Sequence, residues 1–180
     1  KALPLNDPAN ETEKGFLSPY DFYADLVLLS DSDDVIVPCS SGGANSVSMQ
    51  VIEQKLGQVI ITDKGLASMG YGLAGAIGAS MAHPAKRTFL IEGDGGFSQN
   101  LQELATVAVN NLPIKTFIFA NNGYGSIRMT QKNYFGGAYL GCDTETGLGF
   151  PDWDMLFQSF GINTITLDKN WSTNQEVLTA

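Results

Sequence analysis

The sequence is short of basic residues, histidine and cysteine. Of its 180 residues, 10 are Lys or Arg and 19 are Asp or Glu, which gives a net charge of −9, and there is a single histidine. A nucleic-acid-binding surface needs clustered Lys and Arg, so we expect no nucleic-acid partner. An anionic ligand must then be held by backbone amides or by a metal ion rather than by a basic patch.

Two further absences exclude other classes of protein. Cys39 and Cys142 are the only cysteines and lie far apart, so a disulfide framework is not expected and a reducing cytoplasm fits the sequence. No apolar run approaches the ~20 residues that span a bilayer. No signal peptide opens the chain, and we therefore expect no membrane association.

The length suits one domain with a short polar segment before it. Residues 1–17 contain two prolines and no periodic pattern, and we interpret them as an interdomain linker. Residues 18–180 would form the domain. Because the chain starts at Lys1 without an initiator methionine, we expect it to be a portion of a longer protein.

Apolar runs alternate with helical segments along the expected domain. The runs that predict strands are 34–38, 58–62, 87–92, 114–120 and 162–167. The expected helices cover about 19–30, 44–55, 71–82, 98–110, 124–131 and 151–160. Unbroken apolar strands are typical of parallel strands covered on both faces. The pattern predicts an α/β fold with a doubly wound, mostly parallel sheet and helices on both faces.

Ligands of such folds bind outside the carboxyl ends of the strands. Several loops at that edge are rich in small or polar residues: 39–46, 63–70, 93–97 and 121–125. In the third loop, Gly93, Gly95 and Gly96 let the backbone approach a ligand without obstruction by Cβ atoms. The helix expected from about Ser98 would direct free N–H groups to the same place, which favours an anion.

Oxygen ligands for a hard cation are expected at this edge. The Asp94 carboxylate lies in the glycine loop, and Asn121 and the Gly123 carbonyl follow the next strand, so they should emerge beside it. Mg²⁺ prefers such oxygen ligands and completes its octahedron with phosphate and water. An ordinary tight turn would explain the GDG triplet alone, but its pairing with Asn121 favours a metal site.

The segments LIEGDGGFSQNL and FANNGYGSIR resemble the thiamine diphosphate-dependent enzymes, whose signature is GDG followed by an Asn pair. Asn121 lies 27 positions after Asp94, which is the family's spacing for the metal asparagine, and Ala120 stands at the first Asn position. The resemblance implies that Mg²⁺ binds Asp94, Asn121 and the Gly123 carbonyl and holds the cofactor's diphosphate.

The same resemblance implies further contacts with thiamine diphosphate. In the block TDKGLASMGYGLAGAIGA, Met69 would wedge between the two cofactor rings, and the Ala67 carbonyl would accept a hydrogen bond from the aminopyrimidine. The complete set of implied cofactor-binding residues is Ser40, Ser41, Gly42, Ala67, Met69, Gly93, Gly95, Gly96, Asn121, Tyr124 and Gly125.

The chain looks closest to acetolactate synthase large-subunit-like proteins. This implies a lyase or transferase that decarboxylates a small 2-ketoacid and forms a C–C bond, although Thr130 stands where such synthases carry Trp. No residue matches the activating Glu of the family's pyrimidine-binding domain, so we assign no catalytic residue. We expect that domain from the same or a partner subunit, in a homodimer or homotetramer.

Other functions stay open from the sequence. Within the family, a non-oxidative 2-ketoacid decarboxylase or a separate β-type decarboxylase subunit is possible, and outside catalysis a regulatory domain. The run Gly70–Gly75 matches the GxGxxG dinucleotide fingerprint, but its distance from the preceding strand favours helix packing instead. Ser126 and Arg128, just past Asn121, either contact substrate or simply begin a helix.

Overall fold

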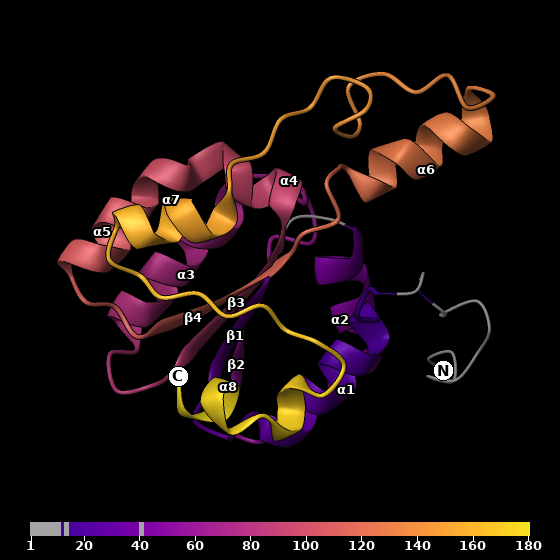
Figure 1. Cartoon of the computed structure of the whole chain (residues 1–180). Helices are drawn as coiled ribbons and strands as arrows, with labels where there is room; N and C mark the ends of the chain where they lie inside the picture. The colour runs from indigo at the N-terminus through magenta and orange to yellow at the C-terminus, as the bar shows by residue number, and fades with distance from the viewer. Residues whose placement is uncertain (1–11, 13–14, 40–41) are drawn as a thin grey trace.

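A computed structural model describes residue 12, residues 15–39 and residues 42–180, with one parallel sheet at the centre (Figure 1). The strands are β1 (Val35–Pro38), β2 (Val59–Ile60), β3 (Thr88–Gly93) and β4 (Ile114–Phe119). Their order is β2-β1-β3-β4, and each pair is parallel. The expected α/β fold is thereby confirmed.

Helical segments precede and follow the strands. They are α1 (Pro19–Leu29), η2 (Gly43–Val47), α2 (Ser48–Val51), α3 (Tyr71–Ala82), α4 (Asp94–Phe97), η3 (Ser98–Glu103), α5 (Leu104–Val109), α6 (Gly125–Tyr134), α7 (Trp153–Ser159), η4 (Trp171–Thr173) and α8 (Gln175–Thr179). In Figure 1, α3, α5 and α7 lie to one side of the sheet and α1, α2 and α8 to the other, while α6 extends away from the body.

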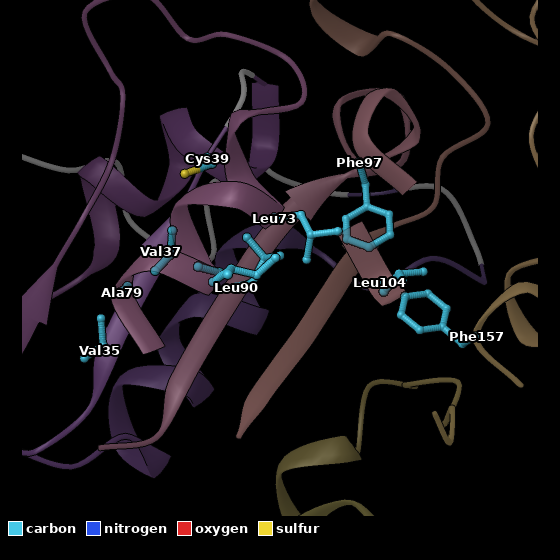
Figure 2. Close-up of a cluster of buried hydrophobic side chains, with 11 residues drawn as sticks. Val35, Val37, Cys39, Leu73, Ala79, Leu90, Phe97, Leu104 and Phe157 are labelled. Atoms are coloured by element: carbon cyan, nitrogen blue, oxygen red, sulfur yellow. The ribbon is translucent and has the colours of Figure 1, made fainter. Parts of the chain in front are cut away.

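Alternate strand residues face two separate cores. Val35, Val37 and Leu90 pack with side chains of α3, α5 and α7 on one face (Figure 2). Ile36 and Phe89 pack on the opposite face with α1, η2 and η4. Side chains cover both faces of the sheet, which is why apolar residues predominate on both faces of its strands.

The sequence determines the start of α1 and its docking. Pro19 occupies the first helical position, and the Ser18 hydroxyl accepts a hydrogen bond from the Tyr20 N–H at 3.2 Å. Both features are typical of a helix N-terminus. Phe22 on the buried side stacks on Trp171 with ring centroids 5.2 Å apart, so the C-terminal segment closes the second core.

The expected helix at about 98–110 differs from the structure. The helical turn begins earlier, at Asp94, and continues through α4, η3 and α5 with a break at Asn100 (φ −144°, ψ 33°). The Asn100 side chain donates to the Gly70 carbonyl at 3.1 Å. This contact with a distant loop leaves no trace in local periodicity. The helix expected to reach residue 55 likewise ends at Val51.

The strand expected at 162–167 was wrong. This segment has no strand conformation and no backbone bonds to β4 within residues 42–180. Ile162 packs with the first core and Leu167 with the second, so the segment crosses from one face of the sheet to the other at the β4 side. The apolar residues of this segment reflect that crossing rather than strand pairing.

The region before α1 is described only in part. Most of the expected linker, residues 1–11 and 13–14, lies outside the described residues. Within the described part, Leu17 packs partly against the second core and Phe16 is exposed. No helix among the described residues has the length and apolar character needed to cross a bilayer.

Candidate metal centre

The pairing of β3 with β4 brings Asp94 and Asn121 together. These strands run parallel with Gly93 opposite Phe119, so both end at the same edge. Asp94 begins α4 directly after β3, and Asn121 lies in the turn after β4. The proximity of the two side chains therefore follows from strand register, as the sequence predicted.

The Asp94 carboxylate is buried, with 1% of the residue exposed. Its Oδ1 accepts the Gly95 N–H at 2.7 Å, and its Oδ2 accepts the Asn122 N–H at 2.6 Å. Burial raises the pKa of the Asp94 carboxyl above its usual value, and hydrogen bonds from backbone N–H groups oppose that shift. A cation beside this carboxylate would favour its charged form.

Three oxygens converge at this point. The Asn121 side-chain oxygen lies 3.3 Å from Asp94 Oδ1 and 2.8 Å from the Gly123 carbonyl oxygen. Turned by half a rotation, the amide would instead donate to both oxygens. With the amide oxygen on this side, a cation between the three oxygens would hold them together, and with the amide nitrogen on this side, hydrogen bonds do so. Bonds of 2.0–2.1 Å place neighbouring ligands of an octahedral Mg²⁺ about 2.9 Å apart, so the donor set fits this ion.

The donor set is chemically specific. Within residues 15–39 and 42–180, no three His, Cys, Asp or Glu side chains gather in a way that could hold a metal. One carboxylate, one amide and one backbone carbonyl suit a hard cation that keeps further positions for water or phosphate. The three oxygens differ from the nitrogen and sulfur ligands of a zinc site.

Tyr124 covers the glycine loop. A Cβ atom on Gly95 would lie 2.2 Å from Cε1 and 2.3 Å from Cδ1 of the Tyr124 ring. The ring thus occupies space that any other residue at position 95 would need. A Cβ on Gly42 would lie 3.4 Å from the Ser126 hydroxyl, so the turn after β4 also approaches the loop after β1.

The loop that carries Met69 contacts η3, the helical segment that follows the glycine loop. Met69 Sδ lies 3.8 Å from the Gln99 amide nitrogen, and the following Gly70 receives the Asn100 hydrogen bond. Met69 is 36% exposed. Ala67 has a positive φ of 51°, a conformation in which glycine is less strained, and its N–H donates to the Asp63 carbonyl at 2.8 Å.

Most of the expected site residues lie along one extended surface groove, which also runs past Arg87 and Ala180 at the other end of the sheet. These site residues are Gly42, Met69, Gly93, Asp94, Gly95, Gly96, Asn121, Gly123, Tyr124 and Gly125. Ala67 is not among the lining residues. Ser40 and Ser41 lie outside the described residues. The contacts between the loops after β3 and β4, together with those of Gly42 and Met69, place these loops beside one another.

The sequence missed a segment that contacts the turn after β4. Residues 142–146, which we call the strap, lie beside that turn, and Gly123 forms an antiparallel bridge with Asp143. Arg128, expected either to meet substrate or to begin a helix, forms an ion pair with Asp143. Only the short spacing of Asp143 and Thr146, typical of a side-chain-closed turn, signals the strap in the sequence.

The dinucleotide-like glycines serve packing. A Cβ on Gly72 would lie 2.2 Å from an oxygen of the buried Glu92 carboxylate, and one on Gly75 would lie 2.8 Å from the Tyr71 ring. Gly72 is therefore required for the close approach of α3 to β3. This agrees with the preference for helix packing over a nicotinamide site.

Comparisons with known proteins identify the family of this chain. Residues 41–180 match the family described as thiamine pyrophosphate enzyme, C-terminal TPP binding domain. The acetolactate synthase isozyme 2 large subunit of Escherichia coli (strain K12) is 37% identical over 146 residues, 78% of this chain and 26% of that protein. The acetolactate synthase large subunit of Pyropia yezoensis is 39% identical over 108 residues, 60% of this chain and 18% of that protein.

A plant protein is similar over a comparable share of its length. Acetolactate synthase 1, chloroplastic, of Zea mays is 33% identical over 113 residues, 61% of this chain and 18% of that protein. The chain thus spans between 18% and 26% of the length of these relatives.

Proposed function

The chain belongs to the thiamine pyrophosphate enzymes, as their C-terminal cofactor-binding domain, and on that premise we propose that it holds the cofactor's diphosphate through Mg²⁺. Asp94, Asn121 and the Gly123 carbonyl would be the protein ligands of the ion. The observation that carries the proposal is the convergence of the buried Asp94 carboxylate, the Asn121 side-chain amide and the Gly123 carbonyl, with the amide 3.3 Å from Asp94 Oδ1 and 2.8 Å from the Gly123 oxygen.

The charge distribution supports a metal-mediated site. The chain carries a net charge of −9, so a diphosphate gains nothing from the overall field. Arg128 lies next to the metal turn, but its guanidinium pairs with the Asp143 carboxylate. Mg²⁺ between the protein oxygens and the phosphates would supply the missing positive charge.

The other residues of the site have distinct roles in this proposal. The Gly96 N–H would approach the diphosphate, Gly95, whose N–H is bonded to Asp94, would leave room for it, and Met69 would support the bent cofactor from the neighbouring loop. Gly42 belongs to the loop on the far side, where Ser40 and Ser41 would also contact the diphosphate. Thiamine diphosphate, when bound, supplies the electron sink for decarboxylation, and the protein contributes orientation and electrostatics.

We infer an acetolactate synthase-like reaction, decarboxylation of a 2-ketoacid with C–C bond formation, from the names of the relatives. Because Thr130 stands where such synthases carry Trp, we do not transfer their ketoacid preference to this chain. A pyrimidine-binding domain from the same or a partner subunit would complete the site, in a homodimer or homotetramer. A cytoplasmic location fits the scarcity of cysteine.

Calorimetric titration with thiamine diphosphate tests the metal site in the full-length enzyme that contains this chain. Asp94→Ala should weaken cofactor binding at least tenfold, and EDTA should do the same to the wild type, because both remove the bridge between protein and phosphate. Asp33→Ala is the matched control, since Asp33 is an exposed carboxylate 3.6 Å from Lys86. Equal affinity of Asp94→Ala and the wild type would contradict the metal site and favour a regulatory domain.

Product analysis tests the reaction. With pyruvate, the full-length enzyme should release acetolactate, whereas acetaldehyde as the only product would favour the decarboxylase alternative. The isolated 180-residue chain should turn over nothing, because it lacks the activating carboxylate. Measurable decarboxylation by this chain with cofactor and Mg²⁺ would contradict the need for a second domain.

A further inference from the structure

The strap is hydrogen-bonded to the two residues that flank Gly123 in the turn 122–124. The Tyr124 N–H donates to the Cys142 carbonyl at 2.8 Å, and the Asn122 carbonyl accepts the Thr144 N–H at 3.3 Å. Between these bonds, Gly123 forms the antiparallel bridge with Asp143. The backbone that carries the proposed metal-binding carbonyl is thus paired like a short strand.

The approach of the strap is close enough to require glycine. A Cβ atom on Gly123 would lie 2.6 Å from the Cys142 carbonyl oxygen and 3.0 Å from Asp143 Cβ. Asn122, the preceding residue, has a positive φ of 59°. Its N–H donates to Asp94 on one side, and its carbonyl accepts from the strap on the other. The strap therefore helps hold a backbone conformation that residues other than glycine seldom adopt.

The Asp143 side chain fixes the strap in two ways. One carboxylate oxygen pairs with Arg128 in α6. The other accepts the Thr146 hydroxyl at 2.7 Å and the Thr146 N–H at 3.0 Å. The Arg128 guanidinium also lies 4.2 Å from the centroid of the Tyr139 ring, so it contacts the segment just before the strap as well as the strap itself.

A second attachment lies further along α6. The Gln131 amide donates to the Leu140 carbonyl at 3.0 Å and accepts the Leu140 N–H at 3.1 Å. Helix α6 starts immediately after the turn 122–124, so the helix, the strap and the turn each contact the other two. These mutual contacts fix the backbone on either side of the Gly123 carbonyl.

We propose that Arg128 and Asp143 are positioning residues for the metal turn, which they fix by holding the strap against Gly123. This inference rests on the proposed function of Asp94, Asn121 and Gly123. Neither side chain is a ligand, and both act through the backbone of the turn. Partners in the outer shell of a metal site typically change its affinity about 10–100-fold when removed.

Ion selectivity separates positioning from general stability. Mg²⁺ and Mn²⁺ demand a compact octahedral arrangement, whereas Ca²⁺ accepts longer bonds and irregular geometry. If the strap fixes the Gly123 carbonyl, releasing it should weaken Mn²⁺ binding more than Ca²⁺ binding. A loss of global stability alone would lower the melting temperature without changing the ratio of the two affinities.

The experiment measures free Mn²⁺ by electron paramagnetic resonance in the full-length enzyme with saturating thiamine diphosphate, and Ca²⁺ by competition. Asp143→Ala and Arg128→Ala should each raise the Mn²⁺ dissociation constant about tenfold and lower the preference for Mn²⁺ over Ca²⁺. The double variant should be no worse than either single one. Arg128→Lys, which keeps the charge, should recover most of the affinity.

Two further variants keep the test decisive. Thr146→Val keeps the side-chain shape but removes the hydroxyl, which donates to Asp143 and accepts the N–H groups of Cys142 and Asp143, so it should produce a loss of the same kind even if Asp143→Ala folds poorly. Asp33→Ala, which breaks the remote pair with Lys86, should leave both affinities unchanged.

The outcomes distinguish this inference from the function on which it rests. If Asp94→Ala weakens Mn²⁺ binding but Asp143→Ala behaves like Asp33→Ala, the metal site stands and the positioning role is wrong. Parallel losses for Mn²⁺ and Ca²⁺, with a lowered melting temperature, would also overturn the positioning role. If Asp94→Ala itself leaves Mn²⁺ binding intact, the proposed metal site fails first.

Discussion

Gly95→Ala tests whether the glycine loop is shaped by the ring of Tyr124. Gly95 lies in α4 with a helical backbone, so alanine adds no backbone strain. The new Cβ would, however, lie 2.2 Å from the ring Cε1, whereas carbon atoms in contact lie about 3.5–4.0 Å apart. The ring must therefore move by more than about 1 Å, or the loop must shift.

The magnitude follows from two opposing contributions. Overpacking of this kind costs about 1–3 kcal/mol, and replacing a helical glycine with alanine returns up to about 1 kcal/mol. We expect a net loss of about 1–2 kcal/mol in the free energy of unfolding, measured by urea denaturation. Gly78→Ala is the control, because Gly78 lies in α3 with no atom within 4 Å of the added Cβ, and it should stabilise the protein.

A double variant shows whether the ring is the cause. In a Tyr124→Ala background the overlap is gone, so Gly95→Ala should become neutral or stabilising. The Gly78→Ala control should have the same effect in both backgrounds, since Gly78 has no contact with the ring. An equal destabilisation by Gly95→Ala with and without the ring would refute the steric explanation.

Three further predictions concern the scaffold. Gly72→Ala should lower the free energy of unfolding by about 2 kcal/mol or more, because the Glu92 carboxylate occupies the required space; an unchanged urea midpoint would contradict this. Asp34→Ala should cost about 2 kcal/mol, since this 2% exposed residue receives two 2.8 Å bonds from Arg87. Arg87→Ala should cost at least as much, because it leaves the buried carboxylate without its ion partner, whereas the half-exposed guanidinium left by Asp34→Ala can be solvated. Burial raises the pKa of the Tyr23 hydroxyl well above its usual value of 10, so the stability it contributes is fully present below pH 10 and is lost as the pH rises further. Tyr23→Phe should therefore reduce the loss of unfolding free energy at alkaline pH. Identical pH profiles of stability for the variant and the wild type would refute this.

The sequence predicted the sheet and the proximity of Asp94 and Asn121 because both depend on local signals. Apolar runs locate β3 and β4, and parallel strands end at one edge, so Asp94 and Asn121 had to lie near each other. The start of α1 was predictable for the same reason, because Ser18 and Pro19 act within one turn. These signals involve no residue distant in the chain.

The errors arose where tertiary contacts decide the local structure. Asn100 breaks its helix to bond with Gly70, thirty residues away in sequence. Ile162 and Leu167 lie in separate cores, so their segment crosses the sheet edge instead of joining it. The strap depends on Arg128 reaching Asp143, a pairing that neither composition nor periodicity indicates.

The strand order has a consequence for the folding pathway. Strand β1 lies between β2 and β3, and its pairing with β3 joins Val35 to Thr88 across a long intervening stretch of chain. Such non-local pairing is slow, because loop closure precedes the contacts that compensate for it. The proposed ligands Asp94 and Asn121 meet only when β4 has paired with β3. Cofactor and metal should therefore bind after the sheet is complete, and at concentrations about 100-fold above the dissociation constant they would stabilise the folded state by about 2.7 kcal/mol.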